Sequence, residues 1–196
     1  MTPETAIRTM WLMWWVSWLA AAAWSDRAVE RPPTRHQIIY RLLAGLGAVL
    51  LFGMYRHDLR VEMIVWRTSI TLAWIMAAVA LAGLLFTWWA RMHLGRLWSS
   101  SVTRKADHHV VNTGPYRIVR HPIYTGIIVA SVATAAMRGT ILAWLGAGVM
   151  TIGWVIKARL EEEFLREQLG LEAYDNYARH VPMLLPRPPR MRSTRQ

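Results

Sequence analysis

The sequence predicts an all-α integral membrane protein with about five transmembrane helices, and three observations support that fold class. The chain has 196 residues, of which 54% are hydrophobic, and its mean hydropathy is +0.20. Its apolar segments alternate with polar joints rich in arginine, as membrane proteins do. It also has 12 tryptophans, and indole rings favour the membrane–water interface. We therefore expect one domain embedded in a bilayer.

The net charge of the chain indicates which classes of partner it is expected to bind. There are 23 lysines and arginines against 12 acidic residues, which gives a formal net charge of +11. In a membrane protein this excess is expected in cytoplasmic loops that face anionic lipid headgroups. No basic face of a soluble module is visible, so nucleic acid is not an expected partner. The absence of cysteine excludes disulfides, a cysteine nucleophile and thiolate metal ligands.

Five apolar segments are the predicted membrane helices: residues 7–24, 38–54, 68–90, 123–137 and 140–156. The third is long enough to cross a bilayer core of ~30 Å at ~1.5 Å per residue. Arg138 and Gly139 alone separate the last two, which predicts a tight helical hairpin. Four indoles share one helix face of the first segment: Trp11, Trp14, Trp15 and Trp18. We interpret that face as packing and anchoring rather than as a lipid- or prenyl-binding wall.

The distribution of arginine predicts the orientation. The positive-inside rule places the basic stretch 91–120 and the arginine-rich C-terminus together in the cytoplasm. The single domain, 1–196, then comprises three N-terminal membrane segments (1–90), a loop, hairpin and C-terminal helices (91–186) and a basic tail (187–196). The expected location is the inner membrane of a bacterium or archaeon, with the polar motifs on the cytoplasmic face.

The densest group of polar residues is GPYRIVRHPIYTG, residues 114–126. Gly114 and Pro115 favour a turn, and Pro122 fits the first position of a helix that has His121 as its N-cap. The free amides of that helix start, together with Arg120, favour binding of a carboxylate or phosphate. From these residues alone, a turn at which the chain enters the membrane is an equally good interpretation.

A second polar cluster, KARLEEEF, occupies residues 157–164. Adjacent residues of a helix point about 100° apart, so Glu161, Glu162 and Glu163 cannot share one direction. We expect at least one to turn toward the protein, where a buried carboxylate needs a cationic partner. The simpler alternative is a helix surface with i,i+4 salt bridges. Farther along the chain, three side chains share one helix face, and this face would lie either on the first polar motif or on the membrane: Tyr174, Tyr177 and Val181.

Together, HHVVNTGPYRIVRHPIYTG, a short apolar hairpin and RLEEEFLREQLGLEAYDNYARHVPMLLP resemble the isoprenylcysteine carboxyl methyltransferase and phospholipid methyltransferase family. The resemblance covers residues 96–186 and is specific in the spacing and order of the motifs. It implies an integral membrane enzyme that uses S-adenosylmethionine as methyl donor. The implied acceptor is a lipophilic or prenylated molecule, such as an isoprenylcysteine carboxylate or a lipid headgroup. The implied cofactor pocket is cytoplasmic and closed by the C-terminal helices.

By position, the resemblance also assigns site residues. It implies cofactor contacts from His108, His109, Val110, Val111, Tyr116, His121, Pro122, Ile123, Tyr124 and Glu161. It implies catalytic or acceptor-binding roles for Arg120, Glu162, Lys157 and Arg159. In the family, an arginine commonly meets the acceptor where this chain has Lys157, and Arg159 follows two residues later. Because lysine lacks the bidentate fork of arginine, this departure bears on which acceptor is bound.

Two other interpretations share these features. Sterol-reductase-like membrane reductases, which bind NADPH, also use an Arg-His-Pro segment, and a non-catalytic membrane binding protein would keep the same polar groups at the interface. The EExxL…YxxY ending favours methyl transfer. No metal is expected, because His108 and His109 are adjacent and point to opposite sides of an extended loop. The sequence leaves the acceptor and the oligomeric state open.

Overall fold

The computed structural model describes residues 1–22, 34–53, 64–95, 111–169 and 171–186. Within these ranges the chain forms six α-helices and one 3-10 helix, η2, with no strand and an isolated bridge between Ile64 and Thr140. The elements are α1 (Pro3–Ala22), α2 (Thr34–Phe52), α3 (Ile70–Leu94), η2 (Gly114–Arg117), α4 (Pro122–Arg138), α5 (Ile141–Leu169) and α6 (Leu171–His180). The predicted all-α fold class is confirmed.

The five predicted apolar segments correspond to α1 through α5, but α5 is much longer than its apolar part. It continues past residue 156 to Leu169 as one helix of 29 residues. The residues that extend it are mainly glutamate, leucine and arginine, which have high helix propensity. A single rigid helix therefore connects the hairpin turn to the glutamate cluster.

The prediction of about five transmembrane helices is not confirmed. In the described part of the chain, two helices are long and apolar enough to cross a membrane, Ile70–Leu94 and Ile141–Glu167. Gln37–Phe52 and Pro122–Arg138 are shorter apolar helices. At ~1.5 Å per residue, the 17 residues of α4 span about 25 Å, less than the ~30 Å of a bilayer core.

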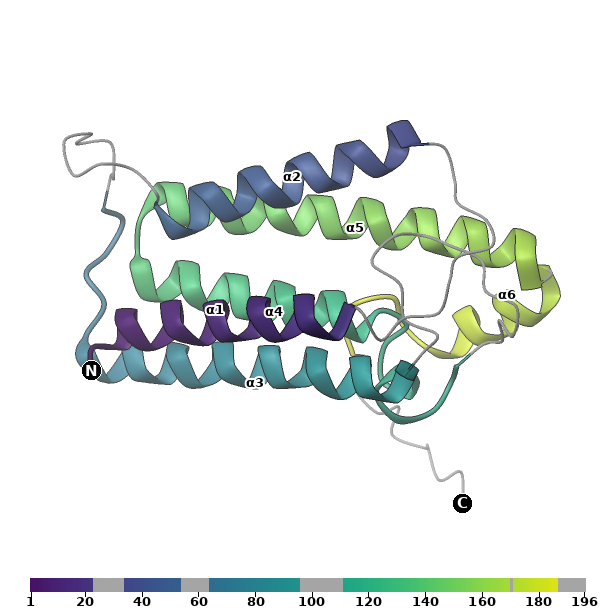
Figure 1. Ribbon diagram of the computed structural model, residues 1–196, viewed down its shortest axis with the longest axis horizontal. Coiled ribbons are helices and arrows are strands. Elements are labelled where there is room, and N and C mark those ends of the chain that lie inside the picture. The colour runs from purple at the N-terminus through teal and green to yellow at the C-terminus, as the bar shows by residue number, and fades with distance from the viewer. Residues whose placement is uncertain (23–33, 54–63, 96–110, 170, 187–196) are drawn as a thin grey trace, which may run out of the picture.

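The helices pack in two layers, with α2 along α5 and with α1 and α3 beside α4 (Figure 1). Glycines allow the closest approaches between them. A Cβ atom added at Gly83 would lie 2.7 Å from the carbonyl oxygen of Gly126, and one at Gly47 would lie 2.8 Å from that of Gly146. Gly45, by contrast, faces open space. Both contacts hold helices of the hairpin, α4 and α5, against their neighbours.

The tryptophans of α1 do not share one environment. The Trp11 indole donates a hydrogen bond to Thr134 Oγ1 at 3.1 Å, and Trp14 donates to Thr87 Oγ1 at 2.6 Å. These bonds join α1 to α4 and α3, so the packing interpretation is confirmed for both residues. Trp15 is 58% exposed, because the buried face of α1 is narrower than the predicted tryptophan stripe.

Candidate functional site

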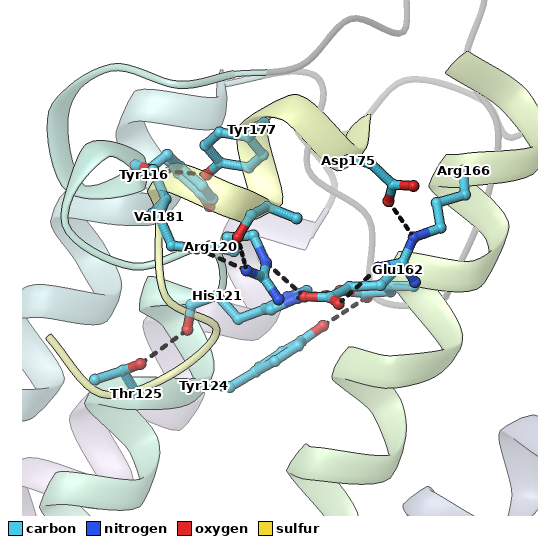
Figure 2. A network of polar contacts seen from close by, with 12 residues as sticks. Tyr116, Arg120, His121, Tyr124, Thr125, Glu162, Arg166, Asp175, Tyr177 and Val181 are labelled. Carbon is cyan, nitrogen blue, oxygen red and sulfur yellow. Dashed lines mark hydrogen bonds and ion pairs between the residues drawn. The ribbon is translucent and has the colours of Figure 1, made fainter. Parts of the chain in front are cut away.

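The two polar motifs meet at one end of the bundle, where η2, the start of α4, the end of α5 and α6 gather (Figure 1). η2 begins at Gly114, whose φ of 55° lies in the left-handed region that favours glycine. His121 is the N-cap of α4 and Pro122 its first residue, as predicted. The turn and the cap hold Arg120 and His121 beside the end of α5 (Figure 2).

Glu162 is the centre of a buried ion network (Figure 2). Its Oε1 atom accepts a hydrogen bond from Arg120 Nε at 2.7 Å, and His121 Nε2 lies 3.0 Å from the same oxygen. Arg166 Nη2 lies 3.9 Å from the other carboxylate oxygen. The side chains of Arg120 and Glu162 are 11% and 8% exposed, so solvent screens their charges little. The expectation that a glutamate turns inward to meet a cation is confirmed.

Glu161 extends this network toward the middle of the bundle. Its Oε1 atom accepts a hydrogen bond from the Tyr124 hydroxyl at 2.5 Å and lies 3.7 Å from Lys157 Nζ. His121 Nδ1 lies 3.6 Å from Oε2, so the imidazole bridges the two carboxylates. The Glu161 side chain is 20% exposed, against 8% for Glu162. Glu161 is therefore the carboxylate more accessible to a ligand.

Stacked aromatic rings lie next to these carboxylates. The rings of His121 and Tyr124 stack at 5.5 Å with an interplanar angle of 9°. Trp154 stacks on the Tyr124 ring at 5.1 Å. Ring faces attract cations, and a nearby carboxylate adds to that attraction. The chain's own Lys157 ammonium uses this attraction, because its Nζ atom lies 5.1 Å from the Tyr124 centroid and 5.7 Å from the Trp154 centroid.

The segment that follows α6 lies across the start of α4. Arg120 Nη1 donates hydrogen bonds to the carbonyl oxygens of Ala178 and Val181, at 2.9 and 2.6 Å (Figure 2). The carbonyl oxygens of Pro182 and Met183 accept from two backbone amides at the junction of η2 and α4, at 2.8 and 3.1 Å. Arg120 thus connects α5, α6 and the C-terminal segment to the first motif.

Three tyrosines line the boundary between η2 and α6. The Tyr177 hydroxyl donates to the carbonyl oxygen of Tyr116 at 2.7 Å, and Tyr174 is 2% exposed. The predicted stripe therefore lies on the site rather than on the outer surface. Burial raises the pKa of Tyr116 well above its ordinary value and raises the pKa of Tyr177 to about 12. Both phenols are protonated at neutral pH, and the Tyr177 hydroxyl acts as a hydrogen-bond donor.

Opposing effects act on the pKa of His121. Burial alone would lower the pKa of His121, but hydrogen bonds to Glu161 and Glu162 and the negative charges of both carboxylates outweigh it. The pKa of His121 is therefore raised above the ordinary imidazole value. The protonated form donates from both ring nitrogens, which suits a side chain placed between two acceptors.

Most of the residues that the resemblance singles out lie in or beside this network. Five are buried: Tyr116, His121, Pro122, Ile123 and Tyr124. Val111 is partly buried against the core, whereas the predictions for His108, His109 and Val110 lie outside the described residues. Lys157 is buried beside Glu161, while Arg159 and Glu163 are exposed. Of the two candidate acceptor cations, the structure brings Lys157 into the cluster.

Sequence reasoning missed several contributors. Arg166 Nε donates to Asp175 Oδ1 at 2.8 Å and so ties α5 to α6. Trp154 precedes Lys157 by one helical turn and shares its face, so helical spacing was a usable signal. Tyr40, whose ring centroid is 5.5 Å from Lys157 Nζ, has no motif around it. Its position depends on how α2 packs against α5.

The fold and site define a helical, largely apolar protein in which a hairpin brings an Arg-His-Pro motif against a Glu-Glu pair. Residues 74–167 match the sequence model of the isoprenylcysteine carboxyl methyltransferase (ICMT) family. The matched segment contains Arg120-His121 and Glu161-Glu162, the pairs that form the ion network. Over this segment the chain is similar to the ICMT family, and this match confirms the resemblance that the motifs predicted.

Individual relatives have several names. The nickel-cobalt-cadmium resistance protein NccN of Alcaligenes xylosoxydans xylosoxydans is 33% identical over 79% of this chain and 66% of its own length. Methanethiol S-methyltransferase 2 of Bradyrhizobium diazoefficiens is 29% identical over 89% of this chain and 64% of its own. Protein-S-isoprenylcysteine O-methyltransferase B of Arabidopsis thaliana is 32% identical over 43% of each chain. The chain thus spans no more than about two thirds of these relatives.

One of these relatives is named for metal resistance, so we looked for metal ligands in the described residues. Within the ranges given above, no three histidine, cysteine, aspartate or glutamate side chains gather in a way that could hold a metal ion. His121, Glu161 and Glu162 are instead bound to one another and to basic or phenolic groups.

Proposed function

We propose that this protein transfers a methyl group from S-adenosylmethionine to a lipophilic or thiol-bearing acceptor. One observation carries the proposal. The Arg-His-Pro and Glu-Glu motifs form one buried network inside the segment that matches the ICMT family, although His121 and Glu162 are 41 positions apart in the sequence. A membrane-entry turn would need the first motif to face headgroups, whereas His121 is 7% exposed and faces two carboxylates.

The chemistry of the site fits such a donor. S-adenosylmethionine carries an ammonium group and a sulfonium, both cationic, and supplies the methyl group on the sulfonium when it is bound. The Glu161 carboxylate, the more exposed of the pair, is the group we assign to the ammonium. We place the sulfonium near the rings of Tyr124 and Trp154, where the Glu161 carboxylate attracts its positive charge. The remaining contacts we assign are those that the resemblance implies, of which Tyr116, Pro122 and Ile123 are buried.

The chain's own residues act mainly by positioning. His121 holds Glu161 and Glu162 apart and in place, and the Tyr124 hydroxyl fixes the orientation of Glu161. Arg120 fixes the C-terminal segment across the start of α4, which limits access of water. Displacement at a methyl group depends on alignment of nucleophile and leaving group, so a rigid site of this kind supplies most of what the reaction needs.

We also propose that the protein is embedded in the membrane with this site at the cytoplasmic face. The two long apolar helices, α3 and α5, support this location. Large apolar side chains on the outer faces of the bundle are exposed, including Leu12 at 64%, Leu42 at 67% and Leu85 at 59%. Contact with lipid acyl chains removes the cost of that exposure. A lipophilic acceptor would then reach the site from the bilayer.

Isothermal titration of the detergent-solubilised protein tests the donor assignment. We expect S-adenosylhomocysteine to bind and NADPH not to bind. Glu161→Ala and His121→Ala should abolish binding of S-adenosylhomocysteine while both variants stay folded by circular dichroism. Binding of NADPH alone would support a reductase instead, and retained affinity in both variants would place the donor elsewhere.

A further inference from the structure

The short helix α6 depends on its neighbours for its position. It has 10 residues, Leu171–His180, and helices of fewer than ~12–15 residues are marginally stable on their own. Tyr174, on its buried face, is 2% exposed, and the Tyr177 ring meets the Tyr174 ring edge-on at a centroid distance of 6.1 Å. The contacts that α6 makes with α5 and η2 therefore decide where the helix lies.

The second half of α6 supports groups of the proposed donor site. The Tyr177 hydroxyl donates to the carbonyl oxygen of Tyr116, a residue that we assign to the donor, at 2.7 Å. The carbonyl oxygen of Val181, just after the helix, accepts from Arg120 Nη1 at 2.6 Å, and Arg120 Nε donates to Glu162 (Figure 2). A shift of α6 would therefore move the groups that hold Tyr116 and Glu162 in place.

An ion pair holds the first half of α6 to α5. Arg166 Nε donates to Asp175 Oδ1 at 2.8 Å, and the Arg166 guanidinium carbon lies over the Tyr174 ring, 5.4 Å from its centroid (Figure 2). The same planar group thus has a carboxylate at its edge and a ring at its face. The side chains of Arg166 and Asp175 are 33% and 50% exposed, so salt screens this pair far more than the buried Arg120–Glu162 pair.

Neither partner of this pair has a role in the motifs. In the EExxL…YxxY ending, Arg166 directly follows the leucine, and Asp175 lies between the two tyrosines. Asp175 also lies outside residues 74–167, so the family match does not include it. The resemblance assigns a function to neither residue, and the contacts in the structure are what connect them to the site.

We propose that Arg166 and Asp175 are positioning residues that keep α6 docked and thereby slow the release of the bound donor and its product; this inference rests on the proposed function. The pair acts through other groups, because it fixes α6, and α6 in turn holds Tyr116 and the Arg120–Glu162 pair. When the pair is broken, α6 keeps the hydrogen bonds of its second half but loses this anchor to α5. The groups around the donor then move more, and a bound ligand leaves sooner.

The dissociation rate of S-adenosylhomocysteine measures this effect. The detergent-solubilised full-length protein is loaded with radiolabelled S-adenosylhomocysteine and chased with excess unlabelled ligand, at a temperature at which every variant is folded by circular dichroism. Arg166→Met and Asp175→Asn should each increase the dissociation rate by about two- to fivefold, as expected for a partly exposed ion pair. The double variant should be no faster than the faster single variant, because both changes remove the same contact.

The response to salt is a second measurement, and a purely structural role would not change it. Raising the ionic strength from about 0.1 M to about 1 M shortens the screening distance from ~10 Å to ~3 Å. The wild-type dissociation rate should then rise toward that of Asp175→Asn, whereas Asp175→Asn, which has no pair left to screen, should change much less. Glu167→Gln on α5 and Arg179→Met on α6 are the matched controls, because both remove exposed charges, and they should behave as the wild type does.

The outcomes separate this inference from the proposed function. If the wild-type protein does not bind S-adenosylhomocysteine, the proposed function fails and the positioning role fails with it. If it binds, but Arg166→Met and Asp175→Asn release it at the wild-type rate, only the positioning role is wrong. The same conclusion follows if the two effects multiply in the double variant, or if the wild type and Asp175→Asn respond equally to salt. Should Arg166→Met not fold, Asp175→Asn, which changes a half-exposed side chain, and its salt response decide the question.

Discussion

Replacing Glu162 tests whether the buried network stabilises the fold around the site. Glu162→Ala removes the acceptor of Arg120 Nε at 2.7 Å and the partner of His121 Nε2 at 3.0 Å. Arg120 keeps its two backbone carbonyl acceptors, but both cations stay buried without a carboxylate at that position. Breaking a buried ion pair from one side costs about 3 kcal/mol or more. The contact to Arg166, at 3.9 Å on a partly exposed side chain, adds little.

Thermal unfolding in detergent measures this effect. For a chain of this size, about 3 kcal/mol corresponds to a decrease in Tm of roughly 6–12 °C. Glu162→Gln keeps the shape and one acceptor oxygen, so it should lose about half as much. Glu163→Ala is the matched control, because Glu163 is the next residue on α5 and is exposed; its Tm should change by less than about 2 °C. Equal losses for Glu162→Ala and Glu163→Ala would refute the buried network.

Three further predictions concern the site and its scaffold. Since the pKa of His121 is raised on folding, its contribution to stability is present below about pH 6.5 and is lost as pH rises through the folded pKa; His121→Gln should flatten the Tm-versus-pH curve on the alkaline side, and an unchanged slope would contradict the assignment. Gly126→Ala would push a Cβ atom into the backbone of α3, so it should lower Tm by several degrees, whereas Gly45→Ala, which faces open space, should not; equal effects would show that the close approach is absent. Trp14→Phe loses the hydrogen bond to Thr87 and should cost about 1 kcal/mol of stability with no change in S-adenosylhomocysteine affinity, so a binding defect would show that α1 reaches the donor site.

The sequence was most informative where local chemistry decides structure. Pro122 after a candidate N-cap residue predicted the start of α4 correctly, and Gly139 marked the hairpin turn, where it adopts a φ of 65°. Helical geometry predicted that the three adjacent glutamates point in different directions. Glu162 is indeed buried, while Glu163 is exposed. Local rules sufficed in these cases because each depends on residues within about one helical turn.

Contacts between distant helices could not be predicted in the same way. Tyr40 faces Lys157 only because Gly47 and Gly146 let α2 and α5 approach closely, and no short motif records that pairing. The Arg166–Asp175 ion pair likewise depends on the angle between α5 and α6. The predicted count of about five membrane helices is not confirmed, because apolar composition, rather than length, defined the shorter predicted segments.

The most direct test of the central claim is transfer of a radiolabelled methyl group from S-adenosylmethionine to membrane extract, with the labelled product identified. We expect label in a lipophilic or thioether product with the wild-type protein and none with Glu161→Ala, although that variant stays folded. Absence of label with the wild-type protein, or equal labelling by Glu161→Ala, would contradict the assignment of the two joined motifs as the methyl-donor site.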